Sequence, residues 1–278
     1  MSALVGPEQL RSELGSVLLL DVRWTLAGPD RAGYRAGHLP GAAFCDLDAD
    51  LAAPPGAGGR HPLPSPSALA ESLGRLGVRP GRRVVVYDGG VAAAAARAWW
   101  CLRWLGHDDV RVLDGGLPAW VAAGGELETR EVTTPLSSAG DVPTEAVAPS
   151  SSMATVAAEE LLDGYEGVLL DARAPERFRG EVEPVDPVAG HIPGARSLPT
   201  ARLLDAEGRY LPAPALRELF AEAGADGGTP VAAYCGSGVT AAQLVLAAHE
   251  AGLDAALYPG SWSHWITDPA RPVATGTA

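Results

Sequence analysis

The 278-residue sequence contains no lysine, so all 21 residues counted as Lys and Arg are arginine. A Schiff-base lysine, a pyridoxal phosphate attachment and the lysine of a P-loop are therefore excluded. Asp and Glu number 34, and the formal net charge is −13. This acidic balance disfavours nucleic acid and anionic membranes as partners.

Cysteine and long apolar runs are also scarce. The three cysteines are Cys45, Cys101 and Cys235, and such an odd, sparse set argues against a disulfide framework and favours a reducing cytoplasm. No uninterrupted apolar run reaches about 18 residues, so no membrane span is expected. The first residues lack the basic and apolar regions of a signal peptide.

Four motifs occur twice, in the same order, along the chain. The pairs are "VLLLDVR" (17–23) with "VLLDAR" (168–173), "GHLPGA" (37–42) with "GHIPGA" (190–195), "RVVVYDGGV" (83–91) with "PVAAYCGSGV" (230–239), and "VLDGGLPAW" (112–120) with "LYPGSWSHW" (257–265). Four repeats in register predict two homologous domains, 1–129 and 154–278. The segment 130–153 between them, rich in Ser, Thr, Pro and Ala, is interpreted as a linker.

Short apolar runs alternate with helical patterns within each half. The runs "SVLLLDVR", "RRVVVYD" and "DVRVLDG" predict strands that are buried on both faces, and "PSALAESLGRLG" and "AAAAARAWWCLRWLG" predict helices. This alternation indicates an α/β fold with a mostly parallel sheet flanked by helices in each domain. Ligands of such sheets usually bind beyond the carboxyl ends of the strands, where Cys235 is expected.

The stretch "YCGSGVT" (234–240) places a cysteine between a predicted strand and a predicted helix. Gly236 and Gly238 allow the backbone to curl and to turn several N–H groups inward, which makes an anion-binding loop. The helix that begins near Thr240 adds its positive N-terminal end. We therefore expect the Cys235 sulfur to have a lowered pKa and to be a thiolate near neutral pH.

The other cysteines have no such loop, and a small buried residue is the usual role of a free cysteine. We assign that role to Cys45 and Cys101. In the repeat, Asp88 aligns with Cys235, so the first domain is expected to be non-catalytic. No arginine follows the loop to clamp a phosphoryl group, which argues against a cysteine phosphatase.

Two halves that each carry "GH[LI]PGA" and a strand-end loop, with cysteine only in the second loop, resemble the tandem rhodanese-domain sulfurtransferases. The resemblance covers nearly the whole chain. The loop "CGSGVT" is similar to that of the 3-mercaptopyruvate sulfurtransferases, whereas the thiosulfate-using branch typically has basic residues directly after the cysteine. "YPGSWSHW" resembles the C-terminal signature of the family, with Pro259 where an Asp is usual.

The resemblance implies that Cys235 attacks the sulfur of 3-mercaptopyruvate, that pyruvate leaves, and that a cysteine persulfide remains. The backbone amides of the loop residues would stabilise the persulfide, and Thr240 would also cap the following helix. The acceptor would be a thiol, reduced thioredoxin or cyanide, with no metal and no organic cofactor. The loop residues that bind in this way are Gly236, Gly238, Val239 and Thr240.

The segment "ERFRGEVEP" (176–184) resembles the family segment that supplies an arginine to the substrate carboxylate. Arg177 is the best match, because a guanidinium can bind a carboxylate through two hydrogen bonds. A solvated arginine or a structural ion pair is the alternative. The second arginine that the family has a few residues later is missing, because Val185 and Asp186 stand there.

The mercaptopyruvate branch also has a set of Ser, His and Asp, which the resemblance assigns to Ser237, His38 and Asp30. The histidine would take a proton from the serine hydroxyl or the substrate thiol, while the aspartate orients its ring. His191 occupies the same motif as His38 in the second half, so a bracing role for His38 is the alternative.

Two other functions remain open. One is a thiosulfate:cyanide sulfurtransferase of the same architecture. The other is a non-catalytic sulfur carrier, in which Cys235 receives sulfur only from a partner protein such as a cysteine desulfurase. Turnover of a small donor without a partner would separate the enzymes from the carrier.

Overall fold

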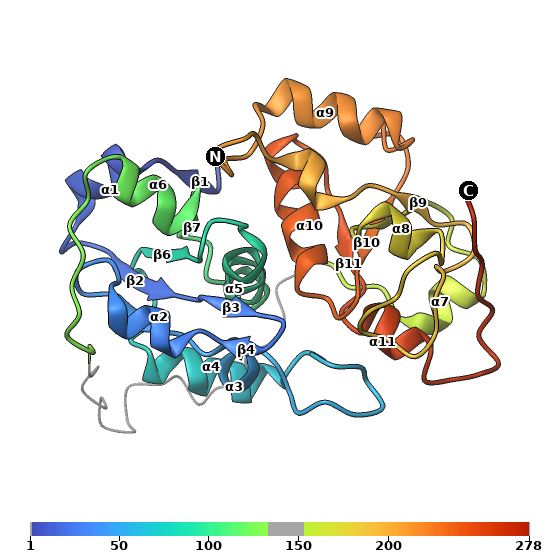
Figure 1. Cartoon of the computed structure of the whole chain (residues 1–278), viewed down its shortest axis with the longest axis horizontal. Helices are drawn as coiled ribbons and strands as arrows, with labels where there is room; N and C mark the ends of the chain where they lie inside the picture. Colours follow the sequence, from blue (N-terminus) through green and yellow to red (C-terminus); the bar gives the residue numbers. More distant parts are fainter. Residues whose placement is uncertain (1, 133–152, 278) are drawn as a thin grey trace. The chain divides into compact units, whose positions relative to one another are not determined.

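The computed structural model describes residues 2–132 and 153–277 (Figure 1). Most of the linker predicted over 130–153 lies outside these residues. The chain divides into two compact units. The first comprises the described residues of Met1–Ala53, Pro64–Met153 and Ala206–Arg209, and the second those of Pro54–Leu63, Ala154–Asp205 and Tyr210–Ala278. Two short segments thus belong to the unit of the opposite half of the sequence.

The first unit is built on a five-stranded sheet. Its elements are β1 (Leu4–Val5), α1 (Pro7–Glu13), β2 (Leu18–Asp21), β3 (Trp24–Thr25), β4 (Gly28–Pro29), α2 (Arg31–Ala36), β5 (Ala43–Phe44), α3 (Leu47–Asp50), α4 (Pro66–Arg75), β6 (Val84–Tyr87), α5 (Ala93–Trp104), β7 (Val110–Leu113) and α6 (Gly116–Ala122). The strand order is β1-β7-β6-β2-β5, and all neighbouring strands are parallel. β3 and β4 form a separate antiparallel pair.

Helices cover both faces of this sheet. Leu10 of α1 and Trp120 of α6 pack in one cluster with Leu19 and Val85 of the central strands. α5 packs against β6 and β7. It lies on the opposite face, because the connection from β6 to β7 crosses the sheet in the opposite direction to that from β1 to β2.

The second unit repeats this plan with four strands. Its elements are α7 (Ala158–Leu162), β8 (Val168–Asp171), α8 (Pro175–Phe178), β9 (Arg196–Ser197), the 3₁₀ helix η1 (Thr200–Leu203), α9 (Ala213–Glu222), β10 (Val231–Tyr234), α10 (Thr240–Glu250), β11 (Ala256–Leu257) and α11 (Ser261–Trp265). The strand order is β11-β10-β8-β9, again parallel. α9 and α10 pack against each other, while α7, α8 and α11 contribute to the core cluster that contains Leu169 and Tyr234.

These elements confirm the predicted fold class. β2, β6, β8 and β10 are buried at every residue, as continuous apolar runs covered on both faces should be. α5 ends before Gly106, whose φ of 80° is the left-handed conformation that commonly follows a helix. Of the helices in the described parts of the chain, none is long and apolar enough to cross a membrane.

Candidate active site

Cys235 directly follows β10, at the carboxyl end of the sheet in the second unit. The residue is 2% exposed, and its Sγ accepts a hydrogen bond of 3.1 Å from the backbone N–H of Gly238. Gly238 has a φ of 79°, and a β-carbon there would clash with the carbonyl oxygen of Pro259. Glycine is therefore required for the turn that aims this N–H at the sulfur.

Residues of α11 form hydrogen bonds with the backbone of the cysteine loop. Trp262 and Ser263 donate their N–H groups to the carbonyls of Cys235 and Gly236, both at 2.9 Å. The N–H of Cys235 donates to Oγ of Ser261 at 3.1 Å. Ser261 is fully buried with a φ of 54°, a strained conformation for a residue other than glycine. Such strain is typical of a functional loop.

The expectation that Thr240 caps the following helix is wrong. α10 begins at Thr240, and Val239 occupies the N-cap position without a side-chain hydrogen bond. Thr240 is already the first helical residue, so its hydroxyl cannot play the part of a cap.

Ser237 forms its hydrogen bond with a histidine that the sequence analysis did not single out. Its Oγ lies 2.8 Å from Nδ1 of His61, and Ser237 itself is 7% exposed. His61 lies in Pro54–Leu63, the segment of the first half that belongs to the second unit. The pair therefore places an imidazole next to Ser237, which follows Cys235 by two residues.

A fifth repeat could have pointed to His61. The stretch "GRH" at 59–61 has the counterpart "GRY" at 208–210. The first stretch lies within Pro54–Leu63, which belongs to the second unit, whereas Gly208 and Arg209 belong to the first unit and Tyr210 to the second. Histidine stands in the stretch that contacts the cysteine loop. Tyrosine stands at the matching position of the other stretch. This difference parallels the difference between Cys235 and Asp88.

His38 has a different environment from the one expected. It is fully buried, its Nδ1 lies 2.7 Å from the carbonyl oxygen of Tyr34, and its ring stacks on that of Tyr34 at 3.9 Å. His191 makes the same contacts with Phe178, at 2.7 Å and 3.8 Å. An imidazole with no exposed surface cannot exchange a proton with a substrate, so these contacts favour the bracing role that was the alternative for His38.

Asp30 also serves its own unit. It is the N-cap of α2, and its Oδ1 accepts the backbone N–H of Gly33 at 2.8 Å. This is the usual work of an aspartate at a helix N-terminus. The contact gives Asp30 a local structural role, and among the described residues no hydrogen bond joins it to an imidazole.

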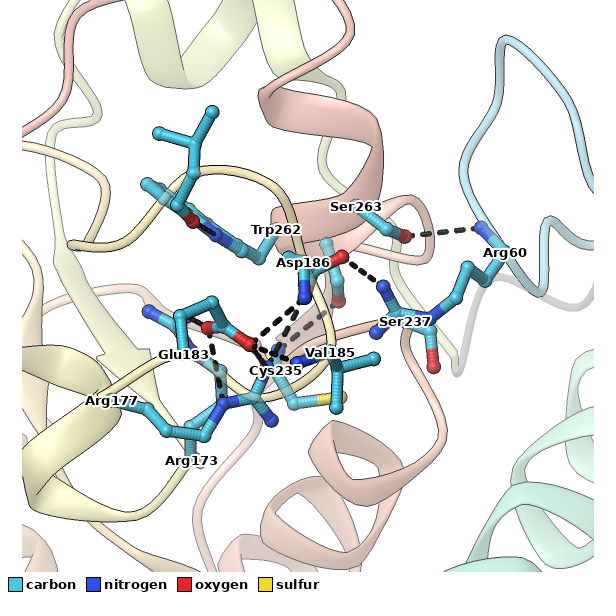
Figure 2. Close-up of polar contacts among 12 residues, drawn as sticks. Arg60, Arg173, Arg177, Glu183, Val185, Asp186, Cys235, Ser237, Trp262 and Ser263 are labelled. Carbon is cyan, nitrogen blue, oxygen red and sulfur yellow. Dashed lines mark hydrogen bonds and ion pairs between the residues drawn. The ribbon is translucent and has the colours of Figure 1, made fainter. Parts of the chain in front are cut away.

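Two arginines stand at the cysteine loop, although the sequence analysis expected one (Figure 2). Arg177 donates to Glu183 at 2.6 Å and to Asp186 at 3.2 Å. Arg60, which precedes His61, also pairs with Asp186. The structural ion pair that was the alternative for Arg177 is therefore present.

Each guanidinium nevertheless keeps one nitrogen turned to the loop. Among the described residues, Nη2 of Arg60 and Nη1 of Arg177 have no hydrogen-bond partner. A β-carbon on Gly236 would lie 2.8 Å from Nη2 of Arg60 and 3.7 Å from Nη1 of Arg177. Glycine at 236 thus leaves room for two guanidinium groups next to Cys235, although no arginine stands at position 185.

Behind the two arginines lies a buried network of charges. Glu183 accepts hydrogen bonds from Arg177, from Arg173 at 3.4 Å and from the backbone N–H groups of Val185 and Asp186. Burial acts to raise the pKa of Glu183, but the hydrogen bond from Arg177 and these N–H groups hold that pKa below its ordinary value of 4.5. The carboxylate therefore stays ionised and fixes the guanidinium of Arg177.

Replacing Glu183 by glutamine is expected to destabilise the second unit by about 3 kcal/mol, because an amide cannot accept the paired hydrogen bonds of a buried arginine. Because its folded pKa is depressed, Glu183 stabilises the protein above about pH 4.5 and loses that effect as the pH falls further. Urea unfolding at several pH values measures both effects. Glu181→Gln, at an exposed carboxylate, is the control; equal stability of the two variants would contradict the expectation.

The first unit has an aspartate where the second has Cys235, and its loop shows what such a loop binds. Oδ1 of Asp88 accepts the N–H groups of Gly90 and Ala92, at 2.9 and 3.0 Å, and Oδ2 accepts those of Ala94 and Ala95, at 3.1 and 3.2 Å. Four backbone donors thus surround a buried anion. The first loop is filled by its own carboxylate.

Over residues 2–132 and 153–277, no group of three or more His, Cys, Asp or Glu side chains could hold a metal ion. All three cysteines are free and buried. The site therefore offers a sulfur, a serine–histidine pair and two guanidinium groups as its reactive and binding groups.

Comparison with known proteins gives the family of this chain. The model of the rhodanese-like domain matches it twice, over residues 6–123 and 155–268. The chain therefore belongs to the rhodanese family, as a tandem of two rhodanese-like domains.

Its relatives narrow the class further. A Mycobacterium tuberculosis protein named "Putative thiosulfate sulfurtransferase SseB" is 50% identical over 94% of this chain and 92% of its own length. A Pseudomonas aeruginosa protein named "Probable 3-mercaptopyruvate sulfurtransferase" is 48% identical over 98% of both chains. The crystal structure of SseA from Escherichia coli, described as a 3-mercaptopyruvate sulfotransferase with the rhodanese fold, superposes with a TM-score of 0.80 and 32% identity, over 95% of this chain and 100% of that one. The chain is a sulfurtransferase, and the resemblance inferred from its motifs is confirmed.

Proposed function

We propose that this sulfurtransferase takes its sulfur from 3-mercaptopyruvate and passes it, through a persulfide on Cys235, to a thiol or cyanide. The observation that carries the proposal is a pair of guanidinium nitrogens beside Gly236, one residue from Cys235, that have no hydrogen-bond partner among the described residues. Two such nitrogens suit the planar carboxylate of an α-keto acid.

In the first half-reaction the Cys235 thiolate attacks the thiol sulfur of the donor. The bond between that sulfur and C3 breaks, and its electron pair leaves with the carbon as the enolate of pyruvate. Protonation of C3 then gives pyruvate, and Cys235 keeps the transferred sulfur as a persulfide. The N–H of Gly238, which already donates to Sγ, would stabilise the negative charge together with the amides of Gly236, Val239 and Thr240.

Ser237 and His61 would transfer protons during this half-reaction. The hydroxyl lies between the cysteine loop and the imidazole, so it can pass the donor's thiol proton to His61 and return a proton to C3 of the enolate. Arg60 and Arg177 would hold the carboxylate during both steps. The first unit, with Asp88 in its loop, would support the fold without a covalent step.

The second half-reaction regenerates the enzyme. A thiolate or cyanide attacks the outer sulfur of the persulfide, the sulfur–sulfur bond breaks, and the Cys235 thiolate leaves. Reduced thioredoxin would be a protein acceptor of this kind. We place the reaction in a reducing compartment such as the cytoplasm, since Cys235 must return to a free thiolate.

One observation favours thiosulfate as a second donor. The guanidinium of Arg60 lies where a side chain at position 236 would begin, and the thiosulfate branch carries a basic residue there. Initial rates with 3-mercaptopyruvate and with thiosulfate, both with cyanide as acceptor, compare the two donors. A higher kcat/KM for 3-mercaptopyruvate supports the proposal, a higher value for thiosulfate overturns it, and turnover of neither by the folded protein leads to the partner-fed carrier.

Arg60→Met and Arg177→Met are each expected to raise the KM for 3-mercaptopyruvate by roughly ten- to hundredfold, because each removes a charge-assisted hydrogen bond to the carboxylate. Steady-state kinetics of pyruvate release measure this. Arg202→Met, at an exposed arginine paired with Glu222, is the matched control and should leave KM unchanged. An unchanged KM in either loop variant would remove that arginine from the carboxylate site.

A further inference from the structure

Two carboxylates and two guanidinium groups lie beside the cysteine loop. Arg60 and Arg177 face Asp186 and Glu183, so the four side chains carry no net charge (Figure 2). The cations are the more exposed members, with side chains 31% and 17% exposed, against 3% for Asp186 and 4% for Glu183. A ligand therefore meets the arginines first, with the buried anions directly behind them.

The two carboxylates have different partners. Glu183 also pairs with Arg173, which is held by Asp171 at 2.7 Å. Asp186 pairs only with Arg60 and Arg177 in the described part of the chain, one through each carboxylate oxygen. Asp186 is thus the negative charge that belongs to the two arginines of the substrate site alone.

We infer that Asp186 determines donor specificity, because its buried negative charge disfavours a dianionic sulfur donor relative to a monoanionic α-keto acid. The inference rests on the proposed function. Thiosulfate brings two negative charges into this neutral, largely buried cluster, whereas 3-mercaptopyruvate brings one. Repulsion by a fixed charge scales with the ligand charge, so Asp186 penalises the dianion about twice as strongly.

Asp186 also lets the site recognise shape instead of bulk charge. By bridging Arg60 and Arg177 it holds one free nitrogen of each beside Gly236. A planar carboxylate can engage both nitrogens at once, and this directional binding survives the loss of net attraction. A site with the same arginines and no Asp186 would attract any small anion, and dianions most of all.

The test is the ratio of kcat/KM for thiosulfate to kcat/KM for 3-mercaptopyruvate in Asp186→Asn. Asparagine keeps the size of the side chain and removes its charge. We expect this ratio to rise on the order of tenfold, with kcat/KM for thiosulfate rising in absolute terms. Glu181→Gln removes one charge from an exposed carboxylate five residues away and should leave the ratio unchanged, because solvent screens that charge.

A merely structural role for Asp186 predicts another outcome. Loosened arginines would weaken both donors, and the ratio would stay level or fall, which overturns the inference. Arg60→Met provides a second, opposite test that does not depend on how well Asp186→Asn folds. It makes the cluster negative, so kcat/KM for thiosulfate should fall more than that for 3-mercaptopyruvate; an equal fall overturns the inference.

These results separate the inference from the proposed function. If the unaltered protein forms no pyruvate from 3-mercaptopyruvate, the proposed function fails before any variant is compared. If it forms pyruvate and the ratio does not respond to Asp186 and Arg60 as stated, only the specificity inference fails. Competition by sulfate and by acetate adds a binding readout: sulfate should inhibit Asp186→Asn more strongly than the unaltered protein, and acetate should change less.

Discussion

Replacing Cys235 by serine is expected to abolish turnover of both 3-mercaptopyruvate and thiosulfate. In the proposed mechanism the intermediate is a persulfide on this residue, and a hydroxyl offers no comparable nucleophile at neutral pH. Pyruvate and thiocyanate formation should fall to the background rate. The mass of the unaltered protein should increase by one sulfur atom after exposure to the donor alone, and the mass of Cys235→Ser should not.

The other cysteines supply the control for this result. Cys45 and Cys101 are both fully buried in the first unit, and burial raises the pKa of each thiol. Cys45→Ala should therefore keep its rate of pyruvate formation, at some cost in stability. Sulfur uptake that persists in Cys235→Ser and disappears in Cys45→Ala would place the nucleophile in the wrong unit and overturn the proposed function.

The cysteine loop could be predicted because its signals are local. An apolar run, a cysteine, two glycines and a helical pattern follow one another within residues 230–252, and they form β10, the loop and α10. Gly238 and the N–H that it aims at the sulfur lie only three residues from Cys235. The strand, turn and helix depend on neighbouring residues, so periodicity and glycine placement suffice to find them.

The partners of the loop could not be found in this way. His61 is 176 residues from Ser237, and Arg60 is 126 residues from Asp186. Both come from a segment that packs with the other half of the sequence. A prediction that treats each half as a separate domain misses this exchange. Such a prediction therefore assigns the proton-transfer role to His38, the histidine of the "GHLPGA" motif.

The two copies of the fold separate structural residues from functional ones. Contacts found in both copies support the fold: Asp21 with Arg23 matches Asp171 with Arg173, and His38 matches His191. Two positions that differ between the copies lie at the cysteine loop, where Cys235 matches Asp88 and His61 matches Tyr210. The two halves of one sequence can thus be compared with each other. Residues that match indicate a structural role, and a difference at the cysteine loop indicates a functional one.

His61→Asn tests this distinction with the second large effect. Asparagine can keep a hydrogen bond to Oγ of Ser237 but cannot take up a proton, so kcat for pyruvate release should fall about a hundredfold or more. KM should change little, since Arg60 and Arg177 still bind the carboxylate. Stopped-flow or steady-state kinetics with 3-mercaptopyruvate measure both constants.

His38→Asn is the matched variant, with the same substitution in a buried, stacked histidine. It should lower the midpoint of thermal unfolding and leave kcat near that of the unaltered protein. If Ser237 and His61 act as one unit, Ser237→Ala combined with His61→Asn should cost little more than either change alone. A large loss of kcat in His38→Asn, with none in His61→Asn, would assign the proton-transfer role to His38. The coupling between Ser237 and the imidazole 2.8 Å away would then be only structural.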